Sequence, residues 1–162
     1  MCDVLWDEVQ QWFDPVENGS APDVIVADTT VADWGRLLGL VQSRGWACRY
    51  EVGDRVLPVP KRAAQLFARG VDGELPLLRV WPDRDLEWIV RPWAAEEILS
   101  DVSLYEIQGQ DRLDVFCQFL RTLGSALGKK VLVYSEGDNT YPPMMVYEVT
   151  DDRVVFLAGP WS

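Results

Sequence analysis

Histidine is absent from the 162-residue chain. The commonest general base, the usual partner of a serine or cysteine nucleophile and the commonest metal ligand are therefore all missing. Carboxylates alone can carry out glycoside hydrolysis, so this absence lowers the expectation of an enzyme without excluding one. We predict a protein that is not an enzyme and that uses no cofactor and no metal ion.

Cysteine is also scarce. The three cysteines are far apart and include no C-x-x-C pair, which argues against a zinc site and against a disulfide framework. Cys117 falls on the apolar side of a predicted helix, and Cys48 alternates with Tyr50 and Val52 on one face of a predicted strand. We expect Cys48 and Cys117 to be buried, inert thiols.

Long hydrophobic runs are missing as well. No apolar run approaches the roughly 18 uncharged residues of a membrane span. The first residues carry no Lys or Arg and lack the apolar core of a signal peptide, so we expect a cytoplasmic protein with no membrane partner. No stretch has the composition of a linker, and 48% hydrophobic residues suffice for one core, so we predict a single domain over residues 1–162.

Phosphate-binding and calcium-binding motifs are incomplete. The segment from Gly124 to Lys130 has three residues between its glycines, where a phosphate-binding loop has four, and it follows a helix rather than a strand. We assign Gly124 to close packing and Gly128 to a helix stop. The oxygen-rich segment Ser135–Tyr141 does not have the spacing of a calcium-binding EF-hand loop, so we predict a surface turn there.

The apolar spacing, capping residues and apolar runs of the sequence predict helices packed on a sheet. The strongest helix runs from Asp111 to Leu127, with apolar residues at three-and-four spacing and Gly128 at its end. Thr30 and Asp33 form a capping box that opens a second helix. Shorter helical segments are expected at 4–13, where Pro15 ends the helix, and at 61–69 and 94–99. Apolar runs predict strands at 24–27, 46–52, 75–81, 86–91, 102–107, 131–134, 144–149 and 154–158. We predict an α+β fold with a mixed or antiparallel sheet.

The net charge of −11 is concentrated at the two ends of the chain. Residues 1–33 contain eight acids and no Lys or Arg, and residues 131–162 contain five acids against Arg153 alone. The residues between them contain 13 acids and 14 bases. If the two ends lie together, they form an acidic field that repels nucleic acid and anionic membranes and attracts a basic protein. Solubility alone explains the same charge equally well.

Three segments, Phe119–Gly124, Val131–Gly137 and Val146–Glu148, resemble in general shape the cytoplasmic immunity proteins of bacterial toxin systems. Those proteins are small, acidic, histidine-poor single domains that cover the active face of a secreted toxin. The resemblance implies a protein that binds and neutralises a basic toxin, and it assigns no individual residue.

The charge distribution leads us to select six partner-contact residues, namely five acids that pair with Arg or Lys and one tyrosine that supplies contact area: Asp7, Glu8, Asp14, Glu136, Asp138 and Tyr141. Two alternatives remain open. A carboxylate-based glycoside hydrolase needs two carboxylates facing each other across a cleft, and a small-ligand regulatory domain needs an apolar pocket with a few polar groups. A homodimer is compatible with the sequence.

Overall fold

The computed structural model describes residues 3–68, 73–137 and 142–158. In chain order, its elements are α1 (Trp6–Val9), the 3-10 helix η1 (Gln10–Phe13), α2 (Pro15–Asn18), β1 (Asp23–Ala27), α3 (Val31–Arg44), β2 (Ala47–Val52), β3 (Arg55–Leu57), the 3-10 helix η2 (Ala63–Phe67), β4 (Pro76–Asp83), β5 (Leu86–Arg91), β6 (Glu97–Asp101), the 3-10 helix η3 (Leu104–Glu106), α4 (Gln110–Leu127), β7 (Val131–Tyr134), β8 (Met145–Glu148) and β9 (Arg153–Phe156).

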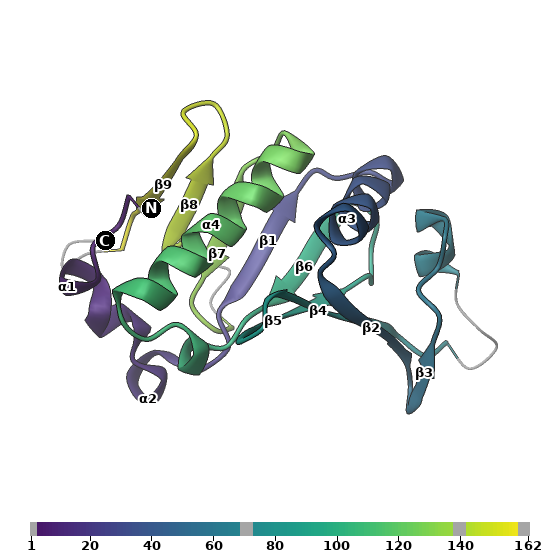
Figure 1. Cartoon of the computed structure of the whole chain (residues 1–162), viewed down its shortest axis with the longest axis horizontal. Coiled ribbons are helices and arrows are strands. Elements are labelled where there is room, and N and C mark those ends of the chain that lie inside the picture. Colours follow the sequence, from purple (N-terminus) through teal and green to yellow (C-terminus); the bar gives the residue numbers. More distant parts are fainter. Residues whose placement is uncertain (1–2, 69–72, 138–141, 159–162) are drawn as a thin grey trace.

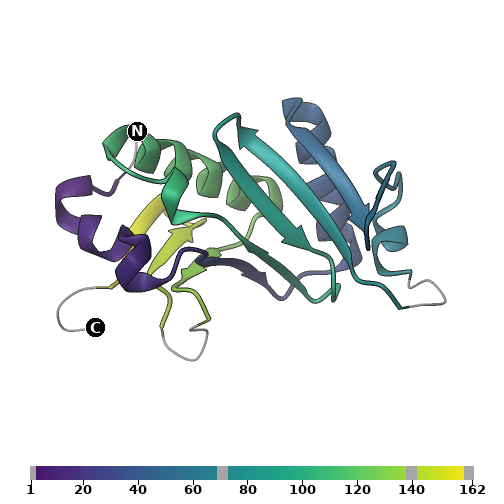
Figure 2. The same cartoon turned by 90° about the horizontal axis from the view of Figure 1, so that it is seen from below.

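The described strands form one nine-stranded sheet in the order β3-β2-β4-β5-β6-β1-β7-β8-β9. Every pair of neighbouring strands is antiparallel. The two long helices, α3 and α4, lie on the same face of this sheet (Figures 1 and 2). The predicted α+β fold with an antiparallel sheet is therefore confirmed. Among the described residues, no helix combines the length and the apolarity that crossing a membrane requires.

Helix α4 lies directly on the sheet because its apolar stripe carries a glycine. Leu113, Phe116, Leu120 and Leu123 are completely buried, as the helical spacing predicts. A Cβ atom on Gly124 would lie 2.2 Å from Cδ2 of Tyr147 on β8, so only glycine permits this approach. Gly128 ends the helix in the left-handed conformation, at a φ of 65°. The assignments of both glycines, to close packing and to the helix stop, are confirmed.

Helix α3 is defined at both ends by the residues that the sequence indicates. The Asp33 carboxylate accepts a hydrogen bond from the backbone N–H of Thr30 at 3.0 Å, which satisfies one of the free N–H groups of the first turn. Gly45 ends the helix at a φ of 65°. Trp34 is completely buried and meets Phe67 of η2 edge-on, with ring centroids 5.2 Å apart. This contact fixes η2 beside α3.

Strand β1 lies in the interior of the sheet, with five strands on one side and three on the other. Val24, Ile25 and Val26 are all at most 5% exposed, so these three residues of the predicted strand at 24–27 are buried on both faces, whereas Ala27 is exposed. β1 pairs with β6 on one side and β7 on the other, and α4 connects these two strands across it. The N-terminal end of β1 therefore lies beside the C-terminal ends of β6 and β7, because both neighbours are antiparallel to it.

Two local predictions are wrong. Strand β6 replaces the helical turn expected at 94–99, and η3 replaces the strand expected at 102–107. Pairing of β6 with β5 and with β1 outweighs the local preference of the chain. Ser100 Oγ on β6 also donates to the Val24 carbonyl at 2.6 Å. The first helical segment ends at Phe13, before Pro15, as predicted, and Pro15 then opens α2, because proline is favoured at the first helical position.

Candidate functional site

The N-terminal segment packs along the β9 side of the sheet and brings the two acidic parts of the chain together (Figure 1). The Asp3 carboxylate accepts a hydrogen bond from the backbone N–H of Val154 at 3.0 Å. The rings of Trp12 and Phe156 lie 6.2 Å apart between centroids. The N-terminal segment and β9, near the C-terminal end of the described chain, therefore lie side by side, as the charge hypothesis requires.

We call this surface the acidic end, and it comprises the acids of the N-terminal segment and of the turn between β8 and β9: Asp3, Asp7, Glu8, Asp14, Glu17, Asp151 and Asp152. The Arg121 guanidinium lies between Asp3 and Asp152, at 3.0 and 3.2 Å, and compensates both. Within the described ranges, the other five acids form no salt bridge. Most of the negative charge of the acidic end is thus available to a partner.

Three of the six selected residues, Asp7, Glu8 and Asp14, lie in the acidic end, whereas Glu136 lies outside it. Asp7 and Glu8 are exposed in the first turn of α1. Asp14 caps α2, where its carboxylate accepts from the Val16 N–H at 2.9 Å. Glu136 follows β7 and accepts from the Ser20 N–H at 3.1 Å, so it is tied to the chain directly after α2. Asp138 and Tyr141 lie outside the described residues.

The acidic end is smaller than the count of eight acids in residues 1–33 predicts. Strand β1 carries the chain away from this surface, so Asp28 and Asp33 lie toward α3. Asp33 is 4% exposed and pairs with Arg36 at 2.9 Å and with Lys129 at 3.9 Å. Its negative charge stabilises the N-terminus of α3 and does not contribute to a docking surface.

A second acidic feature lies where β1 and β6 pair. Asp23 and Asp101 stand directly opposite each other in the register of the two strands. Asp101 forms a salt bridge with Arg91 on β5. Burial raises the pKa of Asp23, and the charge of Asp101 raises it further against the lowering effect of Arg91. Burial also raises the pKa of Asp101, and Arg91 again opposes the shift.

Paired carboxylates with raised pKa values are a known arrangement for acid catalysis. Asp23 and Asp101, however, are side-by-side neighbours on adjacent strands, whereas a glycosidase places its two carboxylates on either side of the bond to be cut. In the described residues, moreover, no group of three or more His, Cys, Asp or Glu side chains is placed to hold a metal ion. The geometry of this pair supports a structural role.

The variant Asp23→Asn is expected to be more stable than the wild type at pH 7. A carboxyl whose pKa rises on folding lowers stability as the pH increases from the unfolded value, about 3.9, through the folded value. The gain should therefore disappear at about pH 3 and below, where the carboxyl is protonated in both the folded and the unfolded state. Urea unfolding at both pH values measures it, with the exposed Asp85→Asn as the control. Lower stability of Asp23→Asn at pH 7 would contradict the unfavourable burial of this charge.

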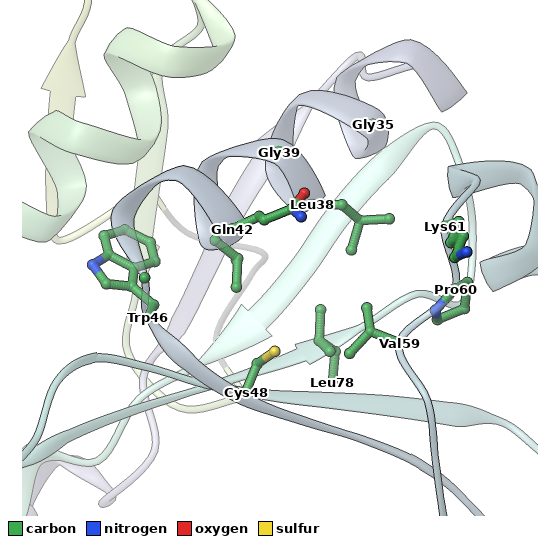
Figure 3. Close-up of a pocket in the computed structure, with 12 residues that line it drawn as sticks. Gly35, Leu38, Gly39, Gln42, Trp46, Cys48, Val59, Pro60, Lys61 and Leu78 are labelled. Atoms are coloured by element: carbon green, nitrogen blue, oxygen red, sulfur yellow. The ribbon is translucent and has the colours of Figure 1, made fainter.

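A cavity of about 620 Å³ lies between α3, β2 and the segment Val59–Lys61 (Figure 3). We call it the α3 cavity. Leu38 faces Leu78 and Val59 across it, Trp46 closes one end, and Lys61 lies at the other. Gln42 and Cys48 also line the cavity, whereas Asp23 and Asp101 do not. The sequence offers no sign of it, because its lining comes from segments that only the folded chain brings together.

The α3 cavity explains why one cysteine prediction is wrong. Cys48 shares the helix-covered face of β2 with the buried Tyr50, but it is exposed because its side chain opens into the cavity. The cavity walls still shield the sulfur, and burial raises the pKa of this thiol, which disfavours the nucleophilic thiolate. Cys117 is completely buried, as predicted, but it is disulfide-bonded and is not a thiol.

Comparison with protein-family models, curated proteins and solved structures found no match. Any function must therefore be inferred from the surfaces of the folded chain.

Proposed function

We propose that the protein is a non-enzymatic binding domain that docks a basic protein on its acidic end, as an immunity protein docks a nuclease-type toxin. The observation that carries this proposal is the packing of the N-terminal segment against β9. It gathers acids from both ends of the chain on one surface and leaves five of them without a basic partner among the described residues.

Exposed apolar side chains on the same surface support the proposal. Leu5, at the N-cap of α1, and Val16, within α2, are 55% and 81% exposed, and Leu157 after β9 is 45% exposed. Apolar anchors surrounded by charged residues are typical of protein–protein interfaces, where the charges steer encounter and the anchors are desolvated.

The test compares two variants with equal net charge. The first neutralises the acidic end with Asp7→Asn, Glu8→Gln and Asp14→Asn, and asparagine preserves the cap of α2. The control neutralises three exposed acids elsewhere, with Asp54→Asn, Asp85→Asn and Glu96→Gln. A basic protein recovered by pull-down at low salt then serves as the analyte in association-rate measurements over a range of ionic strength.

We expect the association rate of the wild type to fall about tenfold or more between low and physiological salt. The acidic-end variant should associate slowly at all salt concentrations, and the control variant should behave like the wild type. Equal losses of association rate in both variants would show that association depends on net charge alone and not on the acidic end. An association rate that does not depend on salt would contradict electrostatic docking altogether.

A further inference from the structure

The α3 cavity lies at the other end of the sheet from the acidic end, because β2 and β9 are separated by six strands (Figure 1). We propose that it binds a small amphipathic carboxylate, with the apolar body of the ligand between Leu38 and Leu78 and its carboxylate at Lys61. This site is independent of the proposed docking surface, and each can fail without the other.

The size and lining of the α3 cavity match a small-molecule site. Its volume, about 620 Å³, lies within the range of about 300–1,000 Å³ that ligand pockets occupy. Leu38, Val41, Trp46, Val59 and Leu78 make most of its wall apolar. The side chains of Leu38, Leu78 and Val59 point toward one another from three different segments, and open space separates them (Figure 3). An apolar ligand body would fill this space and remove the half-buried side chains of Leu38 and Val59 from water, in contact with Leu78, which is already buried.

Two glycines within α3 leave the cavity open. Gly35 and Gly39, one helical turn apart, both line it. A Cβ atom on Gly39 would meet no atom within 4 Å, and one on Gly35 would meet only Ala63 Cβ, at 4.0 Å. Glycine inside a helix is unfavourable relative to alanine, and here no close packing requires it. The contrast with Gly124, whose missing Cβ admits Tyr147, indicates that the space over Gly39 is kept for a ligand.

The charge of the lining selects the polar end of the ligand. Lys61 is the charged residue among the side chains that line the α3 cavity, and no Asp or Glu lines it. Within the described residues, Lys61 forms no salt bridge, so its ammonium group is available. A carboxylate there would gain a charge-assisted hydrogen bond at the open side of the cavity while the apolar body stays inside. A cationic or neutral ligand would lack this interaction.

Octanoate and octanol are suitable probes, because they share an apolar chain and differ in charge. Binding is measured by calorimetry, and its location by protection of Cys48 from iodoacetamide, with the modified peptide identified by mass spectrometry. The variant Lys61→Gln removes the cation, and Gly39→Phe places a ring in the open space above the helix. Circular dichroism and urea unfolding establish that both variants are folded.

We expect octanoate to bind the wild type and to slow Cys48 modification several-fold. Lys61→Gln should weaken octanoate binding about tenfold and leave octanol binding unchanged. Gly39→Phe should weaken the binding of both probes. Absence of Cys48 protection in the wild type would overturn the proposal. Equal affinity of the wild type and Lys61→Gln for octanoate would also overturn it, since the carboxylate would then not be recognised.

Discussion

Gly124→Ala is expected to lower the free energy of unfolding by about 3 kcal/mol. The new methyl group would lie 2.2 and 2.5 Å from two ring atoms of Tyr147 and 3.0 Å from the backbone oxygen of Lys129. The ring cannot move aside without loss, because its hydroxyl group is hydrogen-bonded to Ser125 at 3.0 Å and to Asp152 at 2.7 Å. Urea unfolding measures the change.

The matched control for this prediction is the same substitution in the other long helix. Gly39→Ala adds its methyl group to open space and removes an unfavourable glycine from a helix interior, so it should raise stability by up to about 1 kcal/mol. The two variants should thus change stability in opposite directions. A Gly124→Ala protein as stable as the wild type would show that α4 does not lie as close to β8 as the structure has it.

Arg91→Met should destabilise the protein by about 2–3 kcal/mol at pH 7, the second-largest effect that we expect. Arg91 forms the salt bridge with Asp101, whose side chain is 13% exposed, and its guanidinium also lies 5.9 Å from the ring centroid of Trp93. Without the arginine, the Asp101 carboxylate stays in the sheet beside Asp23 with no compensating charge. Thermal or urea unfolding gives the magnitude.

Two observations test the cause of this loss. It should shrink as the pH falls, because the pKa values of Asp23 and Asp101 are already raised and protonation removes the uncompensated charges. The double variant Arg91→Met with Asp101→Asn should recover most of the stability at pH 7. A loss that is independent of pH and persists in the double variant would instead implicate the packing of the arginine stem.

Helices α3 and α4 could be predicted closely because their signals are local. The apolar spacing of α4, the capping residues of α3 and the glycines at both C-termini act within a few residues, and tertiary packing agrees with them. The hairpin of β4 and β5 can be predicted equally well, because one charged turn separates the two strands.

The region from 94 to 107 could not be predicted, because its structure depends on distant partners. β6 exists by pairing with β5 and β1, and its Ser100 and Asp101 are polar residues that a local reading places in a turn. The same limit applies to the functional surfaces. The charge count identified Asp7, Glu8 and Asp14, but the register that sets Asp23 beside Asp101 and the gap that forms the α3 cavity are properties of the folded chain.

The hydrogen bond from the Val154 N–H to Asp3 also limits how other chains can associate with this protein. β9 is the outermost strand of the sheet on its side, and an unprotected outer strand offers its backbone groups to any passing strand. A side-chain carboxylate already occupies that donor, so extension of the sheet by a second copy or by a bound peptide is disfavoured at this position. This contact therefore reduces the tendency of β9 to pair with another strand and favours recognition of a partner through side chains at this position.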